Sequence, residues 1–195
     1  SELTTLRSLL DQGLQRHLAL IEEVSSVASR EHALEKSLDR MGQEWSRVAF
    51  TLAAHRESSL GVLSGVEEIQ ALLDDQVLRA QAMRSSAHVK PFEDRLLRWE
   101  ALLMTAQEAL DLWLRVQGVW LYLQPVFTSA DIARQMPREA ARFGMADAAW
   151  RKLMGATAQR PLVLDALQQD GLIPALNECA QALEEVQRGL SAYLE

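Results

Sequence analysis

Apolar residues recur along most of the chain at alternating steps of three and four, the spacing of helices that bury one side. Five runs follow this rule, and each predicts a helix with one apolar seam along its length. The runs cover residues 3–24, 34–45, 66–80, 92–120 and 172–193. The sequence therefore predicts an all-α protein, an elongated bundle of long antiparallel helices.

The spacing changes between residues 46 and 64. Apolar side chains from Val48 to Leu52 alternate with polar or small ones, as in a half-buried strand, and HRESS (55–59) supplies turn-forming residues. This pattern predicts one small β-hairpin. The apolar positions also fit a helix that continues from Trp45, so both interpretations stay open, and we favour the hairpin.

The run at residues 92–120 is the most regular of the five. Pro91 stands where a first-turn proline belongs, and Pro125 is expected to close the other end. A helix of this length is long for a globular protein and normal for an extended rod. Its seam consists of Phe92, Leu96, Trp99, Leu103, Ala106, Leu110, Trp113, Gln117 and Trp120.

An irregular joint is predicted at about residues 125–170. Ser129 can cap a short helix (SADIARQM), Pro137 can start another (PREAARF) and Gly144 can end it. One more helix follows at 147–157 before Pro161. Conformational change is normally absorbed at element ends. The possible joint residues are Pro125, Pro137, Gly144 and Pro161, with rigid corners as an equally good alternative.

Composition and charge narrow the class of protein. The 195 residues are 48% hydrophobic and 24% charged, enough for one domain with a substantial core. The net charge is −7, so nucleic acid is not an expected partner. The runs contain too few consecutive apolar residues for a membrane span. Because the helical patterns reach both ends, we expect the chain to be part of a longer protein.

Candidate chemistry is sparse. Gly61 and Gly65 are the nearest approach to a phosphate-binding loop, but Val66 occupies the place of the lysine. Cys179 lies on the last seam and is predicted to be core. Asp74 and Asp75 are adjacent on a helix, so they point apart and are expected to be solvated. No metal site is expected from the scattered histidines, which are His17, His32, His55 and His88.

Three tryptophans lie on the seam of the fourth run. A base-stacking platform would need exposed rings and flanking cations, and only Arg115 is close. Packing in the core or between domains, under one facing partner, is therefore the favoured interpretation of Trp99, Trp113 and Trp120. No catalytic, cofactor-binding or metal-binding residue is predicted in this chain.

One long block of sequence carries a resemblance. WLRVQGVWLYLQPVFTSADIARQMPREAARF resembles the W-x-x-x-Q-x-x-W-x-Y-L-E-P-I-F-x-S-x-D-I-x-x-Q-M-P-x-E block of dynein heavy chains, in the amino-terminal linker region of the motor. Flanking segments such as GVEEIQALLDD, KPFEDRLLRWEALL and VQRGLSAYLE are also similar, so the resemblance runs from about Trp45 to Glu195. Gln124 and Val126 depart from the pattern and preserve its shape. Residues 1–44 are only heptad-like and form a helical entry.

The resemblance assigns a structural fingerprint rather than an active site. The QMP-x-E form and the Asp74–Asp75 pair resemble axonemal heavy chains, whereas PLVLDAL resembles cytoplasmic ones. An axonemal chain is favoured. The fingerprint positions are Trp99, Trp113, Gln117, Trp120, Tyr122, Leu123, Pro125, Phe127, Asp131, Ile132, Pro137, Phe143 and Trp150.

What the resemblance implies is mechanical. The linker of dyneins is a helical arm across a ring of AAA+ ATPase modules, and its swing produces force along a microtubule. The implied partner is the ring of the same heavy chain, with neighbouring dynein subunits or tail elements as further candidates. ATP and Mg²⁺ would bind in the parent motor, outside this chain. The implied location is the cytoplasm and cytoskeleton, with the axoneme of a cilium or flagellum favoured.

Two other classes of function are weighed beside the lever. A passive helical scaffold or tether, spectrin-like, would dock partner proteins and keep one shape in every nucleotide state of the parent. A helical enzyme or small-molecule binder would need a polar-lined pocket, which the sequence does not indicate.

Overall fold

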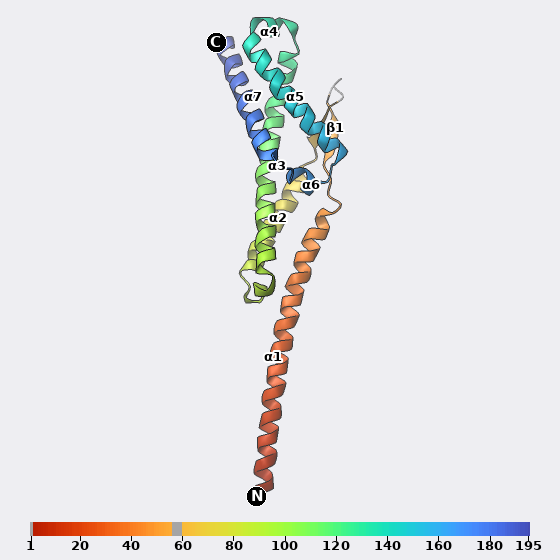
Figure 1. Cartoon of the computed structure of the whole chain (residues 1–195), viewed down its shortest axis with the longest axis vertical. Coiled ribbons are helices and arrows are strands. Elements are labelled where there is room, and N and C mark those ends of the chain that lie inside the picture. The colour runs from red at the N-terminus through yellow and green to blue at the C-terminus, as the bar shows by residue number, and fades with distance from the viewer. Residues whose placement is uncertain (1, 56–59) are drawn as a thin grey trace.

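The computed structural model describes residues 2–55 and 60–195. Its first element is a single helix, α1 (Glu2–Trp45), which extends far beyond the rest of the molecule (Figure 1). The two helices expected from separate apolar runs are therefore one, and that expectation was wrong. Residues 25–33 interrupt the apolar pattern but contain no proline or glycine. The helix continues through them because polar residues do not break backbone hydrogen bonds. They only leave this part of the helix without an apolar face to bury.

A β-hairpin follows α1, as predicted. β1 (Thr51–Ala54) pairs antiparallel with β2 (Gly61–Ser64), with Thr51 opposite Ser64 and Ala54 opposite Gly61. A side chain at Gly61 would place its Cβ 2.9 Å from that of Leu52. Residues 56–59 of the expected turn lie outside the described residues. Gly65 then takes a φ of +61°, a conformation that glycine adopts without strain and that turns the chain into the next helix.

The next three elements form a helical hairpin. α2 (Glu67–Arg84) leads through the 3₁₀ helix η1 (Ala87–Phe92) into α3 (Glu93–Phe127). Pro91 lies in η1 rather than in the first turn of α3. Pro125 does not close α3, contrary to the expectation, because the helix continues to Phe127. Thr128 ends it instead, and its Oγ1 donates to the carbonyl oxygens of Gln124 (3.0 Å) and Pro125 (3.1 Å).

The second half of the chain holds four helices. They are α4 (Ala130–Gln135), α5 (Pro137–Gln159), α6 (Val163–Leu167) and α7 (Leu172–Leu194). Ser129 precedes α4 at the capping position, without a side-chain capping bond. Pro137 begins α5 as predicted, but Gly144 does not end it, and the two helices expected there are one. Gly144 is exposed and its missing side chain faces open space, so the helix passes through it at a small cost.

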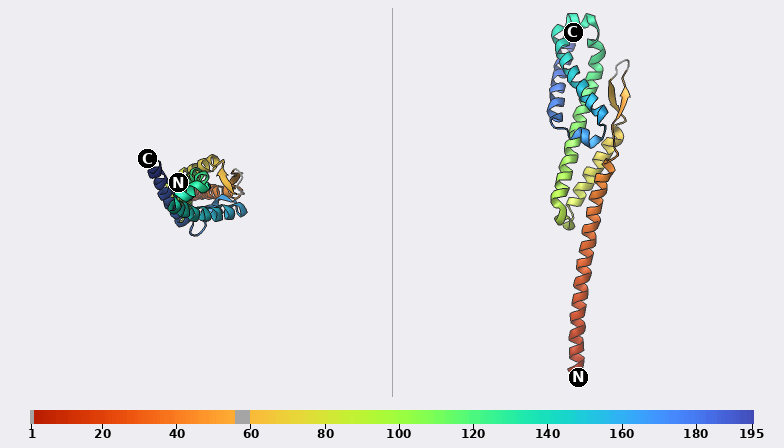
Figure 2. Two further views of the ribbon diagram at one scale, coloured as in Figure 1. Left: turned by 90° about the horizontal axis from the view of Figure 1, so that it is seen from above. Right: turned by 45° about the vertical axis from the view of Figure 1, so that its right-hand side comes forward.

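α3 is the central element of the body (Figures 1 and 2). α2 packs along its first half, and α7 packs beside its second half, running in the same direction as α3. α5 runs in the opposite direction to α7 and packs on it. The expectation that one facing partner would cover the tryptophans of α3 was wrong, because the hairpin, α5 and α6 also contact this helix. The fold class is confirmed: an all-α bundle with one small β-hairpin.

Candidate functional site

Most elements of the body meet where α1 ends. There the hairpin, α2, the middle of α3 and the connection from α5 to α6 come together around buried aromatic rings and amides. We call this region the junction. It comprises residues 45–50, 63, 76, 113–120, 147–150 and 161–163.

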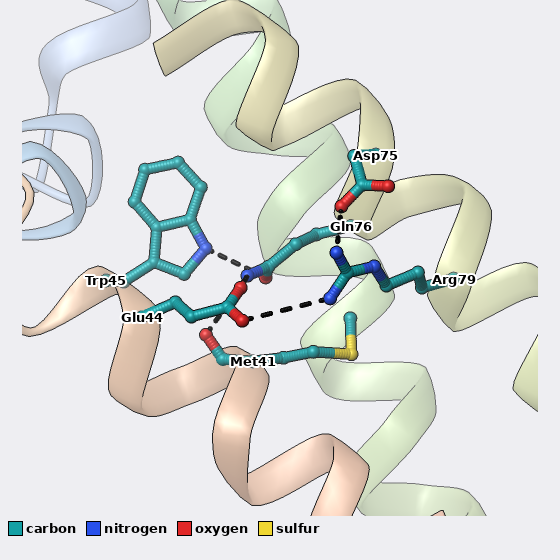
Figure 3. A network of polar contacts seen from close by, with 6 residues as sticks. All are labelled: Met41, Glu44, Trp45, Asp75, Gln76 and Arg79. Carbon is teal, nitrogen blue, oxygen red and sulfur yellow. Dashed lines mark hydrogen bonds and ion pairs between the residues drawn. The ribbon is translucent and has the colours of Figure 1, made fainter. Parts of the chain in front are cut away.

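A buried glutamine joins α1 to α2 (Figure 3). Gln76 is fully buried, and its Oε1 accepts a hydrogen bond of 2.9 Å from Trp45 Nε1. Its Nε2 donates to the carbonyl oxygen of Met41 (3.2 Å) and to Oε2 of Glu44 (2.8 Å). One amide therefore holds the indole ring and the last turn of α1 at once, with both of its polar atoms satisfied.

Ion pairs surround this amide at the surface. Arg79 lies 2.7 Å from Asp75 and 3.8 Å from Glu44, and all three side chains are at least one-third exposed (Figure 3). Asp74 turns the other way and accepts a bond of 2.5 Å from Gln107 of α3. The prediction that the two neighbouring aspartates point apart at the surface is confirmed.

A second buried glutamine joins α3 to the hairpin. Gln117 Oε1 accepts from the backbone N–H of Leu63 at 2.8 Å, and Gln117 Nε2 donates to the carbonyl oxygen of Leu63 at 2.9 Å. The side-chain amide thus pairs with β2 as another strand would, and it satisfies the outer edge of a two-stranded sheet. Gln117 therefore fixes the position of the hairpin along α3.

The tryptophan rings fill the space between these elements. Trp120 and Trp150 are fully buried with ring centroids 5.9 Å apart, and Trp113 lies 5.6 Å from Phe50. Trp120 Nε1 donates to Oδ1 of Asp147 at 2.8 Å. The prediction of a core role is confirmed for Trp113 and Trp120. A stacking platform is excluded for these two rings because neither is accessible to a base.

The segment between α1 and β1 is tied to the connection between α5 and α6. The N–H of Phe50 donates to the carbonyl oxygen of Pro161 at 2.7 Å, and the N–H of Val163 donates to Val48 at 2.9 Å. These two bonds form a short antiparallel bridge between Ala49 and residue 162. Segments more than one hundred residues apart in sequence are therefore held by backbone hydrogen bonds.

The fingerprint residues fall into three groups by burial. Most are inside the body, and the rings of two of them stack with centroids 5.5 Å apart where α3 meets α5, namely Phe127 and Phe143. The buried ones are Trp113, Gln117, Trp120, Leu123, Phe127, Phe143 and Trp150. The half-buried ones are Trp99, Pro125 and Ile132. The exposed ones are Tyr122, Asp131 and Pro137.

Reactive chemistry is not concentrated at the junction. Burial raises the pKa of the Cys179 thiol, and the charge of Glu178 raises it further, so this thiol is a core group as predicted. Within residues 2–55 and 60–195, no three His, Cys, Asp or Glu side chains are grouped to hold a metal ion. No helix in the same described part is apolar and long enough to cross a membrane. The junction is organised to hold elements in place.

Two residues of the junction were not predicted from the sequence. Gln76 continues the buried positions Ile69 and Leu73 toward Ala80 at steps of four, three and four. A polar residue on such a seam is a usable signal, because burial obliges it to find partners. Asp147 gave no signal, since an acidic residue near a helix surface is ordinary. Its importance follows only from its bond to Trp120.

The similarity of this chain to known proteins extends over nearly its whole length. A family model described as "Dynein heavy chain, N-terminal region 2" matches residues 1–195. Dynein axonemal heavy chain 12 of Mus musculus and of Homo sapiens are 43% and 44% identical over 192 residues, which is 98% of this chain. Dynein axonemal heavy chain 3 of Homo sapiens is 38% identical over 195 residues. The chain spans only 5–6% of the length of these relatives.

Proposed function

Because the chain belongs to the dynein heavy chain family, we propose that it is a non-catalytic linker segment of an axonemal heavy chain. In this role it acts as a lever. It passes the ATP-driven conformational change of the AAA+ ring into force along a microtubule. The parent would be a microtubule-motor ATPase of the cilium or flagellum that binds ATP and Mg²⁺ outside residues 1–195. The ring of the same heavy chain is the proposed partner.

The observation that supports this proposal is the way the junction fixes the direction of α1. A lever transmits a swing only if its segments keep their relative angle under load. Trp45 and Gln76 fix the end of α1 on α2, and Gln117 fixes the hairpin on α3. Hydrogen bonds have short distances and preferred directions, so they hold an angle more strictly than apolar packing alone. Both amides are buried, which makes breaking them costly.

Continuity of the core supports the same role. One cluster of buried side chains extends from Leu38 in α1 to Leu190 in α7. Interiors packed at crystal-like density have low compressibility and transmit strain. Force applied to α1 would therefore reach α3 and α7 without passing through a loop that lacks packing.

The experiment loosens the junction inside the complete heavy chain. Gln117→Leu removes the amide that holds Leu63, and its matched control Gln81→Leu makes the same change on an exposed face of α2. We expect Gln117→Leu to retain the microtubule-stimulated ATPase and to lose most of the microtubule gliding velocity. Gln81→Leu should keep both. ATPase activity is the second measurement that separates uncoupling from unfolding of the motor.

Two results would count against the lever. Unchanged gliding velocity in Gln117→Leu, with Leu63 shown to be released, would favour the passive scaffold. The scaffold also predicts the same distance between α1 and the ring in every nucleotide state. ATP hydrolysis by the 195-residue chain alone would contradict the non-catalytic assignment.

A further inference from the structure

The free part of α1 carries an apolar stripe with nothing packed on it in the described chain. Large apolar side chains of this part are between 36% and 63% exposed. Scattered apolar residues on a surface are normal, but a contiguous group on one helix marks an interaction site. The stripe consists of Leu20, Ile21, Val24 and Val27.

The stripe continues the face by which α1 binds the body. Counting from Trp45 towards the amino end in steps of four and three, the positions pass through a buried part and then an exposed part. The buried part is Leu34, Leu38, Met41 and Trp45, with Leu34 only half-buried. The exposed part is Leu20, Val24 and Val27, with Glu31 between the two. Such spacing keeps one face of a helix toward one partner. The body ends before this face does (Figures 1 and 2).

A pocket lies where the stripe meets the body. Its volume is about 230 Å³, and Arg95 and Arg98 form part of its wall. Leu38 and Gly42 of α1 also line it, and they stand two and three whole heptads after Val24 and Ile21. Trp99 Nε1 is buried beside these residues without a hydrogen-bond acceptor in the described chain.

We propose that this stripe is covered by the segment of the parent heavy chain that directly precedes Ser1, folded back as a helix antiparallel to α1. The proposal rests on the proposed function, which makes residues 1–195 part of a heavy chain. The relatives are far longer than this chain, so the parent has sequence to supply such a helix. A segment joined to α1 by a short loop also has a much higher effective concentration at the stripe than a separate partner.

The geometry fixes the character of the covering helix. A helix that lies along α1 from Leu34 back to a loop before Ser1 covers about 50 Å at 1.5 Å per residue, so it needs about thirty-three residues. Running antiparallel, this helix begins at the pocket. Acidic residues are favoured in a first turn and would face Arg98 there, because Arg95 already pairs with Asp39 of α1. A carboxylate in that turn is also a suitable acceptor for Trp99 Nε1. Basic residues are expected further along, opposite Glu22 and Glu23.

The test measures access to the stripe in the complete heavy chain. Val24→Cys places a thiol on the stripe, and Ser26→Cys places one on the opposite side of the same turn. A maleimide reagent and peptide mass spectrometry then give the labelling rate at each position. In the heavy chain we expect Val24→Cys to react at least roughly tenfold more slowly than Ser26→Cys, because a packed side chain reacts only on local opening. In the 195-residue chain alone, the two rates should be similar.

Each other outcome overturns the proposal. Equal rates in the heavy chain mean that the stripe is uncovered. Protection of Val24→Cys in the 195-residue chain that appears with concentration and with a doubled mass means that a second copy is the occupant. A preceding sequence rich in proline and glycine would also exclude the helix. Gliding and labelling are independent measurements, so a linker that fails as a lever can still show a covered stripe.

Discussion

The side-chain amides of Gln76 and Gln117 carry more structural information than their number suggests. Each has a donor and an acceptor directed at different backbone or ring atoms, so each specifies one arrangement of two elements. An apolar side chain of the same size would fill the space but would accept neighbouring registers. Buried polar groups that are fully satisfied specify a unique core in this way.

Trp120 and Asp75 provide the plainest contrast between a buried and an exposed residue. Trp120→Ala should lower the free energy of unfolding by about 3–5 kcal/mol, because it empties a large buried site and leaves Asp147 without its indole donor. Asp75→Ala should change it by less than about 1 kcal/mol, because its pairing with Arg79 is half-exposed. Urea unfolding followed by circular dichroism measures both. Equal small losses would refute the buried seam.

The pKa of Cys179 predicts a dependence of stability on pH. The folded state raises this pKa above that of the unfolded chain, so the neutral thiol is favoured by folding. Its contribution is fully present below the unfolded thiol pKa, near roughly 8.5, and is lost as pH rises through the folded value. The stability difference between the parent chain and Cys179→Ala should therefore move against the parent chain above about pH 8.5. A difference that stays constant to pH 10 would contradict this.

At the scale of elements, the sequence predicted which segments are helical better than where they end. Steps of three and four gave the seams of α3 and α7, and the change of period gave the hairpin. Gly144 and Pro125 led to wrong predictions of helix ends, because a glycine or a late proline raises the free-energy cost of a helix without necessarily ending it. Packing on α7 and α3 outweighs that cost, and packing cannot be read from neighbours in sequence. The role of Asp147 in the junction could not be predicted for the same reason, because its partner Trp120 is 27 residues away in the sequence.

Substitution of alanine for Gly144 or Gly65 tests whether each glycine lies inside a helix or at a turn. Gly144→Ala should stabilise the chain by about 0.5–1 kcal/mol, because Gly144 is exposed within α5 and nothing lies within 4 Å of an added Cβ. Gly65→Ala should destabilise it by about 1 kcal/mol or more, because its φ of +61° disfavours alanine. Thermal unfolding of both variants gives the signs. Destabilisation by Gly144→Ala would mean that α5 is interrupted there after all.

The two prolines that stand at helix boundaries, Pro137 and Pro161, remain candidates for the joint. Pro137 begins α5 just after α4 ends, and Pro161 lies between α5 and α6, whereas Pro125 and Gly144 are inside helices. Pro161 is also held to Phe50 by its carbonyl oxygen. Bending at 161 would therefore have to break this backbone hydrogen bond.

At the scale of the whole molecule, the chain is a packed body with a long arm. Residues of α1 before position 31 have exposed side chains from Gln15 onward, while Leu38, Met41 and Trp45 belong to the core. The stability of the body should therefore depend on the last third of α1 and hardly on the rest. Most helical stability in proteins comes from tertiary packing, so the free part of α1 stabilises little beyond itself.

Two deletions measure how much the free part and the packed part of α1 each contribute to the stability of the body. Removal of residues 1–30 should leave the free energy of unfolding of the body within about 0.5 kcal/mol of its original value, the range of changes away from packed sites. Removal of residues 1–45 should lower it by about 5 kcal/mol or more, because three buried side chains contribute roughly 1.5–3 kcal/mol each. The second deletion also leaves the buried amide of Gln76 without Trp45 and Met41. Urea unfolding of both shortened chains compares them, and equal losses would show that the arm packs on the body along its whole length.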